Sequence, residues 1–229
     1  GILAFLWWRY YWNKRQAEIN EEKIKFFVDI SHELRSPLTL IKSPLDKLLQ
    51  QAHDSTETRA LRNMKRNTDR MLTLVNQILS IRKIEKGQMK LHFAETDLGE
   101  FVEDICHDFD YQTEARKISL TCSKPDNPLM VWIDREHFDK VVTNLITNAI
   151  KYVPDEGEIH VALRTTDDNK AELMVSDNGA GIDEEMLKKV FDRFYQTSAR
   201  PAAGQMGYGI GLNLTQKLTA LHGGTIAAR

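Results

Sequence analysis

The sequence His32-Glu33-Leu34-Arg35-Ser36-Pro37 lies in an uninterrupted helical pattern in the first part of the chain. Two glycine-rich segments follow far downstream, Asp177-Asn178-Gly179-Ala180-Gly181 and Gly207-Tyr208-Gly209-Ile210-Gly211. A histidine on a helix is usually a surface residue and a glycine-rich segment is usually a turn, so neither is specific alone. Together they predict a solvent-facing nucleophile on a helical domain and a nucleotide-binding cradle in a second domain.

Apolar residues around this histidine recur with alternating spacings of three and four, which is typical of coiled coils. Residues 16–50 contain no glycine, and a second stretch from about Ser55 to Lys86 repeats the pattern before Gly87. Because a hairpin of two such helices cannot bury its whole stripe, we expect an all-α helical hairpin that forms a dimeric four-helix bundle, and hence a homodimer. The stripe comprises Ile24, Phe27, Leu34, Leu38, Ile41, Leu45 and Leu48, then Leu61, Met64, Thr68, Met71, Val75 and Ile78.

His32 is predicted to face solvent. It follows Ser31, which occupies a stripe position, and one residue along a helix is a rotation of about 100°. Pro37 has no N–H to donate to the carbonyl of Glu33, so the helix should bend or loosen within a turn of His32. A bundle without a function would gain nothing from this defect, although an ordinary exposed histidine is the alternative interpretation.

The start of the chain is apolar from Gly1 to Trp8 and then turns aromatic and basic, with Arg9, Lys14 and Arg15. This order is typical of a helix that leaves a bilayer on the positively charged side. Eight residues are too few for a span, which needs about 20, so residues 1–12 are interpreted as the end of a transmembrane helix. An aromatic amphipathic helix start is the alternative.

Composition excludes several classes of function. The net charge is −2 with 28% charged residues, so no general positive field favours nucleic acid as a partner. The two cysteines, Cys106 and Cys122, have no CxxC spacing, which argues against a disulfide framework and favours two reduced thiols in the core.

Beyond Lys86 the pattern changes to short strands alternating with helices, without a doubly wound βαβ series. The sequence predicts an α+β sandwich in which helices cover one face of a mixed sheet. Asp97 and Asp134 are expected to cap helices. The expected helices cover residues 97–109, 134–152, 183–194 and 211–222, and the expected strands cover 118–122, 130–133, 158–166 and 170–177, with a further strand beginning at 225–229.

The helix that begins after Asp134 carries Asn144, Asn148 and Lys151 at i, i+4 and i+7, on one stripe. Amide oxygens can ligate Mg²⁺ and a lysine can neutralise phosphate, so this stripe suits an oxygen-rich anion with a hard cation. A solvated polar face is the alternative.

The two glycine-rich segments suit the rest of a nucleotide. Asp177 ends a strand and could accept a hydrogen bond from an exocyclic amine, while Gly179 and Gly181 admit a ring or phosphate close to the backbone. Gly207, Gly209 and Gly211 precede a helix whose N-terminus would face an anion.

Five segments, in order, resemble the conserved boxes of sensor histidine kinases of two-component systems. The resemblance covers nearly everything from residue 16 onward, and five ordered boxes are specific where each alone is weak. The boxes are the H box His32–Leu38, the N box Asn144–Tyr152, the first glycine box Asp177–Ile182, the F box Phe191–Tyr195 and the second glycine box Gly207–Leu212.

The resemblance implies a dimerisation and histidine-phosphotransfer domain of the HisKA type, followed by a catalytic domain with the Bergerat ATP-binding fold, its last strands apparently missing. It further implies that the protein is the cytoplasmic portion of a bacterial inner-membrane protein, or the kinase core of a longer hybrid sensor. The implied boundaries are 1–12 for the transmembrane end, 13–22 for a juxtamembrane linker, 23–87 for the phosphotransfer domain, 88–96 for a linker and 97–229 for the catalytic domain.

The same resemblance implies autophosphorylation of His32 by ATP, with Glu33 as base, then transfer of the phosphoryl group to an aspartate of a response-regulator receiver domain. Asn148 and Asn144 would hold Mg²⁺, Lys151 would meet phosphate, Tyr152 the adenine or ribose, and Asp177 the adenine amine. The glycines Gly179, Gly181, Gly207, Gly209 and Gly211, with Leu212, would complete the ATP site, and Tyr195–Met206 would form a lid coupled to Phe191 and Phe194.

Two alternatives stay open. The first is another enzyme of the same ATP-binding superfamily, a hydrolytic ATPase or a serine-directed kinase; related ATPases place a glutamate where Asn144 stands, and an amide cannot activate water as a base. The second is a dimeric signalling scaffold that binds ATP without catalysis. Ser36 stands where kinases that also dephosphorylate their regulator carry threonine or asparagine, so the sequence leaves phosphatase activity open.

Overall fold

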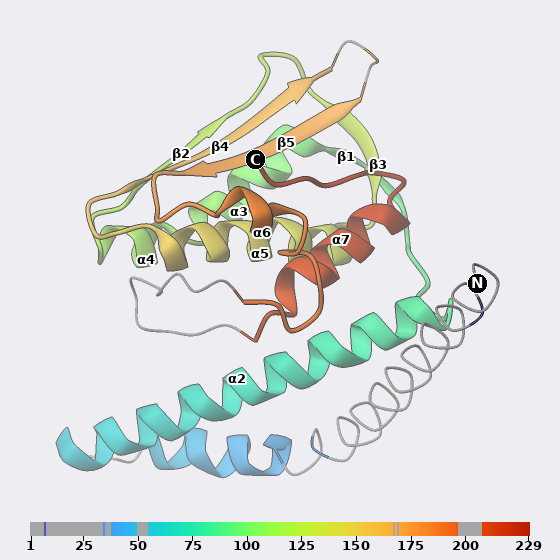
Figure 1. The fold of residues 1–229 in the computed structure, drawn as a ribbon. Helices are drawn as coiled ribbons and strands as arrows, with labels where there is room; N and C mark the ends of the chain where they lie inside the picture. The colour runs from blue at the N-terminus through green and yellow to red at the C-terminus, as the bar shows by residue number, and fades with distance from the viewer. Residues whose placement is uncertain are drawn as a thin grey trace. The chain divides into compact units, whose positions relative to one another are not determined.

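The structure is a computed structural model that describes residues 7, 34, 38–49, 55–166, 168, 170–196 and 208–229 (Figure 1). The chain divides into two compact units, Gly1–Gln88 and Met89–Arg229. The expected transmembrane end at 1–12 and juxtamembrane linker at 13–22 lie outside the described residues, except for Trp7. Among the helices that the structure describes, none has both the length and the apolar composition of a bilayer-spanning segment.

The first unit is an antiparallel helical hairpin, as the sequence predicts. A helix over residues 38–49 packs against α2 (Ser55–Glu85). Leu38 contacts Val75 and Leu79 in an apolar cluster. Ion pairs fix the register, since Lys42 lies 2.6 Å from Asp69 and Lys65 lies 2.5 Å from Asp46.

The hairpin leaves part of its apolar stripe uncovered. Leu45 and Thr68 are buried, yet stripe residues on a neighbouring face remain half exposed. Burial of each aliphatic side chain contributes about 1.5–3 kcal/mol to stability. The described residues of a single copy leave this face exposed, so its burial against a partner would stabilise the hairpin further. These exposed residues are Ile41, Leu48, Met64 and Met71.

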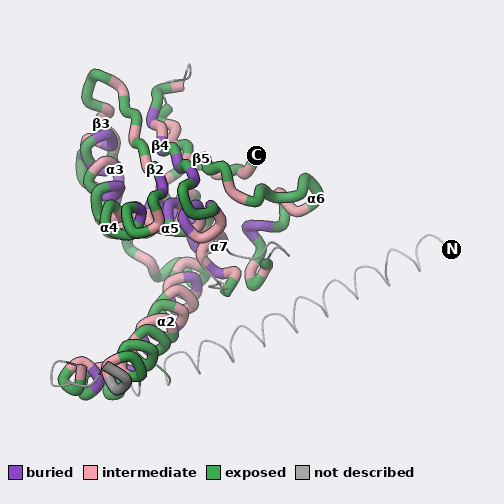
Figure 2. Tube along the Cα trace, turned by 90° about the vertical axis from the view of Figure 1, so that its left-hand side faces the viewer, coloured by how far each residue is buried: buried purple, intermediate pink, exposed green. Residues whose placement is uncertain are grey.

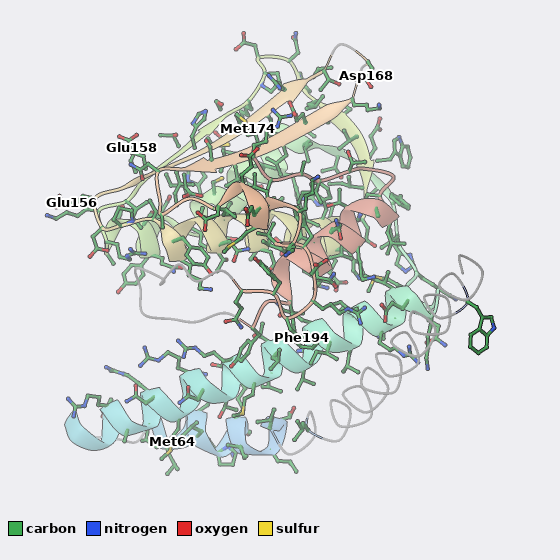
Figure 3. All side chains as sticks on the ribbon, in the orientation of Figure 1. Met64, Glu156, Glu158, Asp168, Met174 and Phe194 are labelled. Atoms are coloured by element: carbon green, nitrogen blue, oxygen red, sulfur yellow. The ribbon has the colours of Figure 1, made fainter. Side chains whose placement is uncertain are left out.

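The second unit contains two small sheets. β1 (Ala94–Asp97) pairs antiparallel with β3 (Met130–Ile133). In the other sheet, β4 (Glu158–Thr165) lies between β2 (Ser119–Ser123), to which it is parallel, and β5 (Ala171–Asp177), to which it is antiparallel. The β4–β5 hairpin confirms the expected pairing across the turn near Asp168 (Figure 3). The sequence analysis did not predict β1, because it assigned residues 88–96 to a linker.

Helices of this unit gather on one face of the β2-β4-β5 sheet (Figure 1), as expected for an α+β sandwich. Buried residues concentrate between the sheet and the helices (Figure 2), with Val142, Ile146 and Val161 fully enclosed. The helices are α3 (Leu98–His107), α4 (Asp110–Glu114), α5 (Arg135–Tyr152), α6 (Glu184–Leu187) and α7 (Gly211–Leu221).

Three expected elements differ in the structure. The helix predicted over 183–194 is only the single turn of α6. After Leu187 the backbone continues in turns, in which the N–H groups of Lys189 and Asp192 bond to carbonyls three residues back, and Phe194 adopts a left-handed backbone (φ 60°) and donates its N–H to the carbonyl of Gly209. No strand forms at Thr225–Arg229 in the described residues; Arg229 approaches Glu172 of β5 electrostatically, without ladder hydrogen bonds. The helix expected over 97–109 is also split, since α3 ends at His107 and α4 follows.

The two cysteines meet inside this unit, as free thiols. Cys106 on α3 belongs to the hydrophobic core, and Cys122 on β2 packs against that core. Burial, together with the neighbouring Cys122 thiol, raises the pKa of Cys106 to about 12. Cys106 therefore lies in the core, as expected, and Cys122 is partly buried beside it.

Asp134 fixes the start of α5 and ties it to two other segments. Its Oδ1 accepts from the N–H of His137 (2.9 Å) and its Oδ2 accepts from the N–H of His92 (2.7 Å). Its own N–H donates to Nε2 of His222 (3.1 Å), whose Nδ1 donates to the carbonyl of Leu218 (2.8 Å), which defines a neutral tautomer. Burial raises the pKa of the Asp134 carboxyl, but the backbone N–H groups of His92 and His137 outweigh it and lower the pKa to about 2.

We predict that Asp134→Ala destabilises the second unit by about 1–2 kcal/mol, because it removes a helix cap and leaves the His92 N–H without its acceptor. The wild-type carboxylate contributes its stabilisation above its unfolded pKa of 3.8, and this contribution is lost as pH falls through about 2. Urea unfolding of wild type, Asp134→Ala and Asp134→Asn between pH 5 and pH 2 tests both statements. An unchanged free energy of unfolding in Asp134→Ala at pH 5 would contradict the first, and a parallel pH dependence in wild type and Asp134→Asn would contradict the second. Glu136→Gln, which removes an exposed carboxylate of the same helix turn that pairs with Lys140, is the control.

Candidate active site

The polar stripe predicted on α5 lies at the boundary of the core. Asn144, Asn148 and Lys151 are each half buried, whereas Val142 and Ile146 on the opposite side are fully enclosed. The packing of that apolar side fixes the rotation of α5, so the stripe faces outward along a single line.

The N-terminus of α7 begins beside this stripe. A Cβ added at Gly211 would lie 3.5 Å from Oδ1 of Asn144, and α5 and α7 pack closely. Ile210 occupies the N-cap and provides no side-chain hydrogen bond, so the first N–H groups of α7 retain the capacity to bind an anion. The structure therefore brings Asn144 and Gly211 together, as the sequence analysis requires.

Gly209 has a left-handed backbone (φ 68°) that other residues rarely adopt. A Cβ there would lie 2.5 Å from the carbonyl oxygen of Tyr195, so only glycine permits this approach. Leu212 is half buried in the first turn of α7. Gly207 lies outside the described residues, as do residues 197–206 of the predicted lid Tyr195–Met206.

The first glycine segment contacts the other end of α5. Asp177 ends β5, is exposed, and accepts from the N–H of Gly179 through Oδ1 (2.9 Å). Its second carboxylate oxygen can therefore accept a hydrogen bond from a ligand. A Cβ at Gly179 would lie 2.8 Å from the carbonyl oxygen of Tyr152, while Gly181 has a left-handed backbone (φ 70°) in open space.

Lys151 and Tyr152 end α5 next to this segment. The ammonium of Lys151 donates to the Tyr152 hydroxyl (3.0 Å) and lies 4.5 Å from the centre of its ring. A cation held on an aromatic ring keeps donor capacity for a phosphate oxygen, because an ammonium has three N–H groups. Lys151 and Tyr152, the residues expected to contact phosphate and the adenine or ribose, are thus bonded to each other, and the carbonyl group of Tyr152 lies next to Gly179.

Two residues near the site were missed by sequence reasoning. The buried Asn213 of α7 donates to the carbonyl of Phe191 (2.8 Å) and accepts from Arg193 (3.3 Å), which ties the F-box segment to α7. Asn213 stands between two leucines, Leu212 and Leu214, and this isolated amide in the sequence could have indicated a buried hydrogen-bonding role. Arg116, which binds the end of α5, has no local signal in the sequence.

The donor set suits a hard cation only together with a ligand. In the parts of the chain that the structure describes, no cluster of three His, Cys, Asp or Glu side chains could hold a metal ion. Asn144 and Asn148 offer amide oxygens, which fit Mg²⁺ when phosphate oxygens and water complete its shell. His32 and Glu33 lie outside the described residues.

Two family models match the chain in succession. Residues 22–87 match the His Kinase A (phospho-acceptor) domain, and residues 133–229 match the histidine kinase-, DNA gyrase B- and HSP90-like ATPase family.

Curated relatives extend over both units. Hybrid signal transduction histidine kinase D of Dictyostelium discoideum is 35% identical over 91% of this chain, and sensor histidine kinase WalK of Bacillus subtilis is 30% identical over 93%. The chain spans 14% and 35% of the lengths of these two proteins.

Solved structures agree with the fold. The catalytic domain of histidine kinase ThkA is 28% identical, with a TM-score of 0.52 over 60% of this chain and 87% of that one. Full-length ShkA in complex with AMPPNP has a TM-score of 0.74 over 89% of this chain and 42% of that one, and at 21% identity it shows the fold alone.

The phosphoacceptor-family segment, the ATPase-family segment that follows it and the relatives that span both show that this chain belongs to the histidine kinase family, as a histidine kinase core.

Proposed function

We propose that this protein is a protein-histidine kinase, which transfers the γ-phosphoryl group of ATP to a ring nitrogen of His32. One observation supports this proposal above all: the N-terminus of α7, which has no side-chain cap, lies next to the polar stripe of α5, where Gly211 is close to Asn144. Helix N–H groups bind phosphate, and an amide next to them suits a phosphate-bound cation.

The nucleotide would bind across the face of α5. Asp177 would accept a hydrogen bond from the adenine amine, Tyr152 would contact the adenine or ribose, and Lys151 would donate to phosphate. Asn148 and Asn144 would hold Mg²⁺, which when bound neutralises charge on the phosphates. The remaining contacts with the nucleotide would come from the backbone of Gly179, Gly181, Gly207, Gly209, Gly211 and Leu212.

The phosphoryl step needs a nucleophile rather than an activated water. A nitrogen–phosphorus bond to His32 forms while the bond between the β–γ bridging oxygen and the γ-phosphorus breaks. ADP leaves with the electron pair of the broken bond, and Glu33 receives the proton of the ring. Asn144 favours this outcome over hydrolysis, because an amide cannot accept a proton from water. We further propose that His32 then donates the phosphoryl group to an aspartate of a receiver domain, in another protein or in a longer hybrid chain. ThkA has been solved in complex with the response regulator TrrA, which supports a partner of this kind.

The apolar face of the first unit supports a homodimer. Ile41, Leu48, Met64 and Met71 are half exposed, and a second hairpin that covers them would complete a four-helix bundle. We propose residues 23–87 as the dimerisation and phosphotransfer domain. The catalytic domain would be the second unit, Met89–Arg229, because β1 lies within the expected linker 88–96 and pairs with β3 of that unit. We also propose that the segment before residue 13 continues into a membrane helix, with the described units in the cytoplasm.

Wild type incubated with [γ-³²P]ATP and Mg²⁺ is expected to gain a phosphate that is labile in acid and stable in alkali, whereas His32→Gln gains none. The phosphoramidate of histidine has this stability pattern, and phosphoserine does not. Labelling that persists in His32→Gln would refute the kinase assignment, and wild type that binds ATP without labelling would identify a scaffold.

Asp177→Asn is expected to weaken ATP binding by about 10- to 100-fold, because a hydrogen bond to a charged group is worth about 1.5–3 kcal/mol. Titration with a fluorescent ATP analogue measures this effect. Asp168→Asn makes the same change at the exposed β4–β5 turn and should leave the affinity unchanged (Figure 3). Equal affinities for wild type and Asp177→Asn would place the adenine elsewhere.

Met71→Glu is expected to shift the protein from dimer to monomer at micromolar concentration, because a carboxylate would be desolvated at the bundle seam. Sedimentation velocity measures the oligomeric state. Met174→Glu, at a similarly exposed methionine of β5, is the matched control, and a monomeric wild type would contradict the bundle.

A further inference from the structure

Arg116, in the turn between α4 and β2, binds the C-terminal end of α5. Its Nη1 donates to the carbonyl of Ile150 (2.5 Å) and its Nη2 to the carbonyl of Val153 (2.8 Å). Its Nε donates to the carboxylate of Asp155 (2.7 Å). The Arg116 side chain is only 17% exposed, and Asp155 lies on the solvent side of it.

This arrangement replaces the hydrogen bonds that α5 cannot make itself. The last carbonyl groups of a helix have no partner within the helix, and Pro154 prevents continuation because it restricts Val153 to an extended backbone. A guanidinium satisfies two of these carbonyls at once and places positive charge at the negative end of the helix dipole. A lysine could reach only part of this set.

The backbone around Arg116 holds the same two turns together. The carbonyl of Arg116 accepts from the N–H of Glu156 (3.0 Å), and the next residue, Lys117, pairs with the Glu156 carboxylate (2.9 Å). Lys117 and Glu156 both have left-handed backbones (φ 54° and 63°), which cost about 1 kcal/mol or more each in residues other than glycine. Such strain persists only where surrounding contacts determine the conformation.

The end of α5 that Arg116 holds carries residues of the candidate site. Lys151 and Tyr152 lie between the two bound carbonyls, those of Ile150 and Val153. The carbonyl of Tyr152 abuts Gly179, so a shift of this helix end would also displace the segment that follows Asp177. Arg116 therefore acts on the site indirectly, through the backbone carbonyl groups of Ile150 and Val153.

We propose that Arg116 is a positioning residue for the nucleotide, which fixes Lys151, Tyr152 and the Gly179 backbone in the geometry that binds ATP. The inference rests on the proposed function, because it assigns Arg116 a role in that same site. Arg116 touches no reacting atom, so its loss should weaken ATP binding while the rate at saturating ATP stays near that of wild type.

The test compares Arg116→Lys and Arg116→Gln with Arg164→Lys, an arginine of β4 that pairs with Glu172 at the surface of the same unit. Affinity for a fluorescent ATP analogue and the KM and kcat of autophosphorylation are measured well below each variant's Tm. We expect Kd and KM to rise about tenfold in both Arg116 variants with kcat retained, and no change in Arg164→Lys. Wild-type Kd and KM in Arg116 variants whose Tm is lowered would show a purely structural cap and overturn the inference.

Two further readouts separate the possible failures. Wild type that binds no adenine nucleotide would refute the proposed function, whereas normal binding by the Arg116 variants beside weakened binding by Asp177→Asn would refute only the role of Arg116. If neither Arg116 variant folds, hydrogen exchange of residues 150–157 in wild type decides. Slower exchange with bound nucleotide is expected, and exchange unaffected by nucleotide would overturn the inference.

Discussion

The second unit depends on how α5 is held at its two ends. Asp134 caps the first turn and connects it to the segment before β1 and to the end of α7, while Arg116 binds the last carbonyls. Between these anchors, one side of the helix fills the core and the other side carries the amides and the lysine of the site. The core contacts fix the rotation of α5 and the caps fix its ends, so the site residues need few contacts among themselves.

The parts of this arrangement that depend on local patterns could be predicted from the sequence. Asp134 followed by a helical pattern, the Asn144–Asn148–Lys151 spacing and the alternation of β4 and β5 are each visible within one element. The helical hairpin of the first unit is equally local, because its stripe repeats within each helix. The helices and strands were confirmed because packing agrees with local preference, whereas the ligands of the Asn144–Asn148–Lys151 stripe stay a prediction.

The missed features depend on partners far away in the sequence. β1 reads Ala-Glu-Thr-Asp, which has little β propensity, and forms through pairing with β3 more than thirty residues later. Phe194, at the end of the segment where a helix was expected, bonds to Gly209, and Arg116 gains its role from carbonyls of α5. No window of neighbouring residues contains this information.

The thiols of Cys106 and Cys122, between α3 and β2, are expected to react slowly with alkylating reagents in the folded protein. Only a thiolate reacts readily with alkylating reagents, and burial raises the pKa of the Cys106 thiol to about 12, so that it stays protonated at pH 7. Burial likewise raises the pKa of Cys122. Unfolding returns both groups to the pKa of an ordinary thiol. The rate at which the native cysteines are alkylated therefore reports how often this core opens, and no cysteine has to be introduced for the measurement.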